Sequence, residues 1–249
     1  MGDALHVPGA RLPGAVPPAP PSPVVQGFQP TEDLRGFVER NLERADDPPT
    51  AYRVAHALEE CAVLGPPGED RSWIELAAAS ALAEPCRGFD GQAIEPLRIV
   101  ALLARAAENG EPHALARMLL FRDIAAPKSE VMAEIPMLLA TRDPAVVRDV
   151  GAFLSKGEAA WRFGSEEVAA PAAAIAWELA SCDLGYACGP ASRLMLALCA
   201  FDGQCESGYY EDALMRHEPP ELMAQAQRLR DGILRALRDH DWVWLGVTT

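Results

Sequence analysis

Lysine is nearly absent from this sequence, and acidic residues are in excess. Only Lys128 and Lys156 occur among 22 basic residues, against 36 acidic residues, for a formal net charge of −14. A nucleic-acid backbone is bound through Lys and Arg, so this charge excludes nucleic acid as a partner. An anionic membrane surface would also repel the chain. No apolar stretch approaches the ~18 residues that cross a bilayer, so no transmembrane segment is expected.

Aromatic residues are also scarce, at 6% of the chain. Aromatic and β-branched residues do not cluster with a period of two, so no sheet is predicted. The sequence contains no Walker loop, G-x-G-x-x-G, G-x-S-x-G, H-E-x-x-H or EF-hand motif. We therefore expect no cofactor, no metal site and no catalytic residue that belongs to a linear motif.

Alanine is the commonest residue, and it has the highest helix propensity. Apolar residues recur at helical spacing, as in Leu34, Phe37 and Val38, with Thr31 as the expected N-cap. This pattern predicts eleven helices, at 31–45, 51–62, 73–83, 94–107, 112–121, 129–139, 143–155, 165–182, 191–200, 210–215 and 220–238. The expected fold is an all-α array of short antiparallel helices, α-solenoid-like and without a sheet.

The N-terminal segment differs from the rest of the chain in composition. Residues 7–30 contain eight prolines and almost no charge, which is typical of an extended, polyproline-like linker. We therefore expect residues 1–30 to form a disordered tail. A single helical domain should follow over residues 31–249, with a division into 31–125 and 126–249 as the alternative.

A weak internal repeat runs through the helical part. Ala51, Ala114 and Ala145 each follow a polar turn and are 63 and 31 residues apart, compatible with a period near 31. The string Ala-Ala-x-x-Gly-x-x-x-Ala at 106–114 resembles the helix-turn-helix junction of SEL-type repeats, which are relatives of the tetratricopeptide repeat. The segment 176–185 and the cysteines after it are similar to exported bacterial proteins that carry such helices. The resemblance implies stacked helix pairs, and it implies nothing about chemistry.

Six cysteines are present, at Cys61, Cys86, Cys182, Cys188, Cys199 and Cys205. The last four form two C-x5-C segments, and in each the first cysteine is at a helix end and the second is in the loop that follows. An even count with duplicated spacing predicts two local disulfides, which leaves Cys61 for Cys86 if the third helix is short or bends back. A four-thiolate zinc site and six free thiols are the alternatives, although structural zinc prefers C-x2-4-C.

Disulfides indicate an oxidising compartment, so a periplasmic or secreted location is expected. Residues 1–30 contain no charged n-region and no apolar h-region of a signal peptide. We therefore expect the true export signal to lie upstream of this chain, with a cytoplasmic protein as the alternative.

Candidate functional residues are few. His56 and Glu60 share a helix face at i, i+4 and would be the only general-base pair of an enzyme. Two aromatic pairs, Tyr209–Tyr210 and Trp242 with Trp244, are the candidate binding anchors. Helical arrays present concave surfaces to other proteins, so the predicted function is non-catalytic binding of a protein or peptide partner. An enzyme with an unrecognised His/carboxylate site and a cytosolic adaptor with free thiols are the alternatives.

Overall fold

The structure is a computed structural model, and it describes residues 33–62, 72–121, 128–156, 161–205 and 208–247. This part of the chain is mostly helical, which confirms the all-α prediction in outline. The expected helix bounds agree with those observed to within a few residues, except at the start of the eighth helix. The described residues form eleven α-helices: α1 Leu34–Asn41, α2 Pro48–Ala62, α3 Trp73–Ala83, α4 Pro96–Glu108, α5 Pro112–Leu119, α6 Lys128–Ala140, α7 Pro144–Leu154, α8 Ala170–Asp183, α9 Arg193–Asp202, α10 Tyr210–His217 and α11 Pro220–Asp239.

Local sequence explains where several helices begin. Pro144 occupies the first position of α7, and the Asp143 carboxylate in front of it accepts hydrogen bonds from two backbone N–H groups of the first turn. At α1 the cap is Asp33, which accepts a hydrogen bond from the Gly36 N–H. The predicted cap, Thr31, lies outside the described residues.

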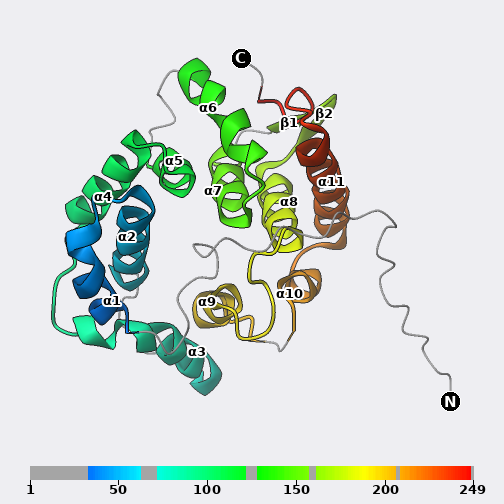
Figure 1. Ribbon diagram of the computed structural model, residues 1–249. Helices are drawn as coiled ribbons and strands as arrows, with labels where there is room; N and C mark the ends of the chain where they lie inside the picture. Colours follow the sequence, from blue (N-terminus) through cyan, green and yellow to red (C-terminus); the bar gives the residue numbers. More distant parts are fainter. Residues whose placement is uncertain (1–32, 63–71, 122–127, 157–160, 206–207, 248–249) are drawn as a thin grey trace.

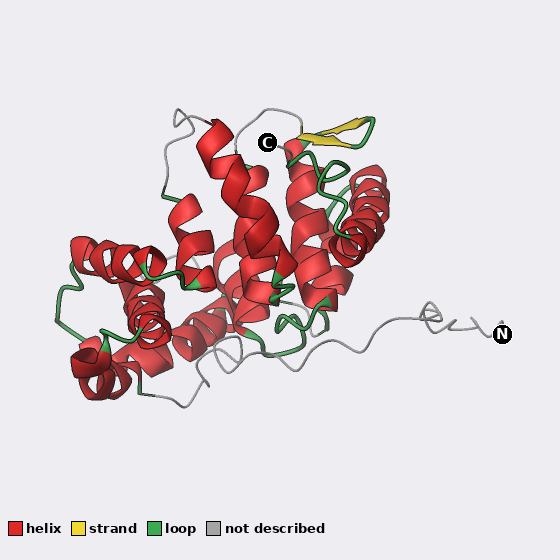
Figure 2. Ribbon diagram, turned by 45° about the horizontal axis from the view of Figure 1, so that its top comes forward, coloured by secondary structure: helices red, strands yellow, loops and turns green. Residues whose placement is uncertain are grey.

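Seven helices pack in a row that follows the chain (Figure 1). The contacts run from α1 to α2, α4, α5, α7, α8 and α11 in turn. Helices α3 and α9 pack on each other below this row, away from α6 and α11 (Figures 1 and 2). A 3-10 helix, η2 (Glu84–Phe89), connects α3 to α1. The inner faces of α2, α5, α7 and α8 therefore lie around the middle of the molecule. A solenoid-like repeat of these helices remains a prediction.

Two main apolar cores are present, and α5 belongs to both. Ala114 packs into a core with Leu103 and the other buried residues of α1, α2 and α4. Leu119, less than two turns further along α5, packs into a core with Trp177 and Ile233 that also takes in α6, α7, α8 and α11. Smaller apolar groups join α8 to α10 and α3 to α9. Helix α5 thus couples the first half of the chain to the second.

A short β-hairpin corrects the prediction that the chain has no sheet. Strand β1 (Trp161–Phe163) pairs antiparallel with β2 (Glu166–Val168), where the start of a helix at residue 165 was expected. The eighth helix begins instead at Ala170. The turn depends on Gly164, whose φ of 57° suits glycine and whose N–H donates to the Trp244 carbonyl, 2.8 Å away. Each strand has only three residues, too few for a period of two to be recognised.

All six cysteines are paired: Cys61 with Cys86, Cys182 with Cys188, and Cys199 with Cys205. The last two pairs are those that the duplicated spacing predicts, with Cα atoms 5.6 and 4.2 Å apart. The long-range pair forms because α3 ends at Ala83 and η2, which carries Cys86, lies against the end of α2. The alternatives of zinc ligation and free thiols are therefore wrong for this structure.

Candidate functional site

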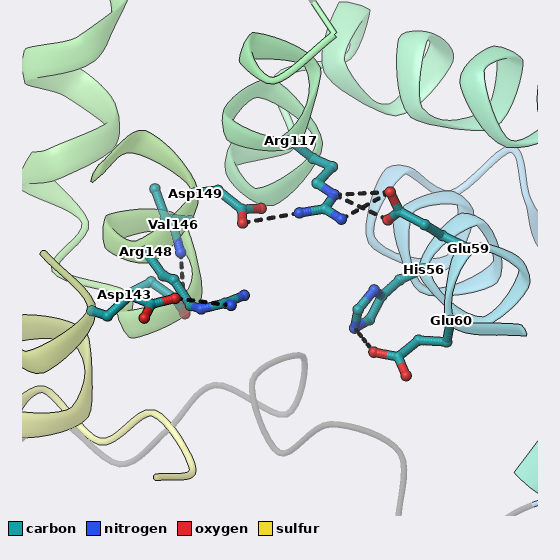
Figure 3. Close-up of polar contacts among 9 residues, drawn as sticks. His56, Glu59, Glu60, Arg117, Asp143, Val146, Arg148 and Asp149 are labelled. Atoms are coloured by element: carbon teal, nitrogen blue, oxygen red, sulfur yellow. Dashed lines mark hydrogen bonds and ion pairs between the residues drawn. The ribbon is translucent and has the colours of Figure 1, made fainter. Parts of the chain in front are cut away.

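Ionisable side chains from five helices meet in the middle of the array, and Figure 3 shows those of α2, α5 and α7. Each side chain is 11–30% exposed, so water reaches the group although most of it is covered. Charged residues are rarely this buried without partners. We call this group the inner cluster, and its members are His56, Glu59 and Glu60 of α2, Arg117 of α5, Arg148 and Asp149 of α7, Glu178 of α8 and Arg193 of α9.

Arg117 connects the two sides of the inner cluster. Its Nε and Nη2 donate to both oxygens of Glu59 at 2.8–3.1 Å. Its Nη1 donates to Asp149 at 3.2 Å, so one guanidinium bridges α2 and α7 (Figure 3). Burial opposes the charge, but Asp149 and Glu59 outweigh it and raise the pKa of Arg117 further above its ordinary value. The bridge is therefore permanently charged and has most of its donors occupied.

His56 and Glu60 are brought together as their spacing predicts. The Nε2 of His56 lies 3.6 Å from the Glu60 carboxylate, one turn further along α2. Burial, followed by the positive charge of Arg117, lowers the pKa of His56 to about 4, so the imidazole is neutral at pH 7. Burial raises the pKa of Glu60, although Arg193 opposes this by pairing with the carboxylate. This pair therefore combines a neutral ring with a carboxyl group that holds its proton more tightly than usual.

Arg148 extends from α7 toward His56, on the opposite side of the cluster (Figure 3). Its Nη2 lies 3.3 Å from the Glu178 carboxylate, and its guanidinium lies over the Tyr186 ring, 5.1 Å from the centroid. Tyr210 donates its hydroxyl hydrogen to the same carboxylate. Burial and the Glu178 charge raise the pKa of Tyr210, so its phenol stays protonated. The Nε of Arg148 is buried and has no hydrogen-bond partner among the described residues.

A second buried histidine lies beside the inner cluster. His113 places Nδ1 2.7 Å from Glu111 and Nε2 3.1 Å from Asp143, and its ring stacks on Tyr52 with centroids 5.1 Å apart. Burial opposes protonation of His113, but the bonds to Asp143 and Glu111 outweigh it and raise its pKa to about 9. At neutral pH this histidine is a cation that joins α5 to the start of α7.

The aromatic anchor candidates lie elsewhere, in separate environments. Trp244 packs so closely on Gly232 of α11 that a Cβ there would lie 2.3 Å from its ring, and its ring centroid is 5.4 Å from that of Phe163. Trp242 is also partly buried against the second core. Tyr210 is buried under the inner cluster, whereas Tyr209 is 63% exposed. Of the four, only Tyr209 is fully available to a partner.

The arginines of the inner cluster were missed by sequence reasoning, although one signal could have found two of them. Arg117 and Arg148 each stand three residues after a repeat alanine, Ala114 and Ala145, and are 31 residues apart. The weak period therefore places two arginines at equivalent positions of neighbouring helices, facing the same space. The acidic partners carry no such pattern.

Among the described residues, no cluster of His, Cys, Asp and Glu is arranged to hold a metal ion. No helix in that part of the chain combines the length and apolar character needed to cross a membrane. Comparison with protein-family models, with curated proteins and with solved structures finds no match to this chain. Its function therefore has to be inferred from the inner cluster and its surroundings.

Proposed function

We propose that this protein is a non-catalytic binding protein that recognises a protein or peptide partner through the inner cluster. The observation that carries this proposal is the cluster itself, in which eight ionisable side chains converge on the middle of a helical array yet stay 11–30% exposed. A purely structural network would be expected to satisfy its donors, and the buried Nε of Arg148 is unsatisfied.

The side-chain types favour binding of a partner. Arg and Tyr are enriched among the residues that dominate the free energy of protein–protein association. Here the Arg148 guanidinium lies over the Tyr186 ring, which restricts its position before a partner arrives. A preorganised side chain loses less conformational entropy on binding, so more of its interaction energy appears as affinity.

Export to an oxidising compartment is part of this proposal. Three disulfides in one chain of 249 residues support it, because such bonds rarely persist in a reducing cytosol. With all six cysteines paired, a cytosolic adaptor that works through free thiols has no support.

The test is capture of a partner by the disulfide-bonded protein, followed by a matched pair of variants. Envelope and cytosolic extracts of the native host would be passed over the immobilised chain, and retained proteins identified by mass spectrometry. We expect an envelope protein whose affinity falls as salt rises, because charge interactions are screened beyond ~8 Å at physiological ionic strength. Tyr186→Leu should abolish this binding, and Tyr209→Leu should leave it unchanged. The opposite result would place the partner on the exposed Tyr209 surface instead.

A hydrolytic enzyme is the second candidate, and His56 with Glu60 is the observation that favours it. Burial shifts both groups in the directions that distinguish catalytic residues, with His56 neutral and the pKa of Glu60 raised. Fluorogenic ester, glycoside and phosphate-monoester substrates would be assayed with the wild-type chain, His56→Gln and Glu60→Gln. Turnover lost in both variants would establish an enzyme. No turnover above that of the variants would leave the binding function.

A further inference from the structure

The arginines of the inner cluster differ in how fully they are used. A guanidinium offers five N–H donors. Arg117 uses a donor from each of its three nitrogens, toward Glu59 and Asp149. Among the described residues, Arg148 makes one polar contact, from Nη2 to Glu178, besides lying over the Tyr186 ring, and Arg193 makes one, from Nη2 to Glu60. The remaining donors of Arg148 and Arg193 are what the cluster can offer to a ligand.

The position of these donors indicates a ligand beside Glu60 of α2, between Arg148 of α7 and Arg193 of α9. Arg148 points from α7 toward α2, and Arg193 pairs with Glu60 from α9. Arg193 pairs with Glu60, and the charges of Arg117 and Arg148 also act to lower the pKa of this carboxyl, so all three guanidinium groups lie near it. A planar guanidinium with unused N–H donors can form two parallel hydrogen bonds to the two oxygens of a carboxylate.

We propose that Arg148 and Arg193 together hold the C-terminal carboxylate of the partner peptide. The inference rests on the proposed function and names the chemical group that the partner inserts. Nε and the free Nη of Arg148 would donate to its two oxygens from one side, and Arg193 would donate from the other.

The net charge of the protein and the partial burial of both arginines favour the end of a peptide chain over other anionic ligands. The protein carries a net charge of −14, so polyanions and phosphate dianions are repelled more strongly than a single carboxylate. The arginines are also recessed, with 29% of the Arg148 side chain and 23% of the Arg193 side chain exposed. A chain end can enter such a site, whereas an acidic side chain in mid-sequence brings backbone on both sides.

Glu60 offers a way to accommodate the added negative charge. It faces His56 on its own helix, Arg117 from α5, Arg148 from α7 and Arg193 from α9. His56 is neutral, so protonation of Glu60 removes a competing carboxylate and frees Arg193 for the ligand. Because burial raises the pKa of Glu60, this proton is taken up more readily than by an exposed glutamate. Carboxylate affinity should therefore rise as the pH is lowered toward that pKa.

The experiment uses the full-length, disulfide-bonded protein labelled with ¹⁵N and two probes that differ in one group. N-acetyl-Ala-Ala-Ala with a free C-terminal carboxylate is titrated against the same peptide with a C-terminal amide. The Arg148 Nε–H resonance, assigned by its disappearance in Arg148→Lys, is the readout. We expect a saturable shift with the free acid and affinity for the amide at least about tenfold weaker, since a charge-assisted bidentate pair is lost.

Variants add a second arm. Arg148→Lys and Arg193→Lys should each weaken binding of the free acid about tenfold, because lysine keeps the charge and loses the planar fork. Arg235→Lys, an exposed position on α11, is the matched control and should bind like wild type. Circular dichroism checks that each variant is folded, and the acid–amide comparison on the wild-type protein does not depend on any variant.

Four outcomes would overturn the inference. Equal shifts with acid and amide would show that the carboxylate is not recognised. Equal affinity for acetate or inorganic phosphate would show a general anion site rather than a site for a chain end. Equal affinity for the amide of N-acetyl-Asp-Ala-Ala would assign the site to an acidic side chain. If a captured partner binds wild type and Arg148→Lys equally, the proposed binding function survives and this inference fails. If the free acid binds but no partner is captured, the carboxylate site is established and the proposed function of partner binding fails.

Discussion

Arg117 and Glu59 form a two-pronged ion pair between α5 and α2, with the third nitrogen of the guanidinium turned to Asp149 on α7. The two carboxylates lie 58 and 32 residues from Arg117 along the chain. Helix α5 also contributes apolar residues to both cores. The polar bridge and the apolar packing of α5 therefore hold the same two halves of the chain together.

Removal of this bridge should destabilise the protein strongly. In Arg117→Gln the carboxylates of Glu59 and Asp149, 14% and 11% exposed, lose their common cation. We expect the free energy of unfolding to fall by about 2–4 kcal/mol, because partly buried charges are left uncompensated. Arg105→Gln is the matched control, since its ion pair with Asp46 is exposed and should contribute less than about 1 kcal/mol. Similar losses for both in urea unfolding would show that the bridge is no stronger than a surface pair.

The free energy of unfolding should fall in alkaline solution because His113 loses its proton. Its pKa is about 9 in the folded protein and about 6.5 in the unfolded chain. The folded state thus binds the proton more tightly, and the resulting stabilisation, about 3 kcal/mol by linkage, is fully present below about pH 6.5. It should be lost as the pH rises through about 9. Chemical unfolding between these pH values should show the decline in wild type, and His113→Gln should remove most of it. An equal slope in both proteins would assign the decline to other groups.

Gly151 should not tolerate a methyl group. In the interior of a helix, Gly→Ala usually stabilises by about 0.5–1 kcal/mol. Here a Cβ at Gly151 of α7 would lie 2.4 Å from the Trp177 side chain of α8, so the two helices would have to separate. We expect Gly151→Ala to lower the free energy of unfolding by about 1–3 kcal/mol. Gly189→Ala, whose nearest neighbour would be 3.6 Å away, should change it little. A stabilised Gly151→Ala variant would contradict this packing.

The Cys182–Cys188 bond should contribute independently of the other two disulfides. Replacing both residues with Ser should cost about 2–4 kcal/mol of unfolding free energy. Peptide mapping without reduction should still find Cys199 linked to Cys205. The loop that this bond closes carries Tyr186, so the Ser variant should also change the environment of the Arg148 Nε–H. A peptide that links Cys182 or Cys188 to Cys199 or Cys205 would overturn the local pairing.

Local chemistry made much of the helical framework predictable. Asp143–Pro144 at α7, for example, forms the expected N-terminus because a cap and a proline act over a few residues. The i, i+4 spacing of His56 and Glu60 places them on one face in the same way. The hairpin could not be predicted, because its strands are stabilised by burial against the second core and by a bond from Gly164 to Trp244, 80 residues later.

The sequence by itself determined most of the helices, the cap of α7 and the two local disulfides, because each depends on residues a few positions apart. Tertiary structure alone decided the Cys61–Cys86 bond and the inner cluster. The partners of Arg117 and Arg148 lie 30–58 residues away and carry no spacing signal. The pairing of carboxylates with guanidinium groups depends on how α2, α5, α7 and α8 pack. This packing is driven by burial of apolar surface, which has no direction and depends on many residues together, so no short stretch of sequence reveals it.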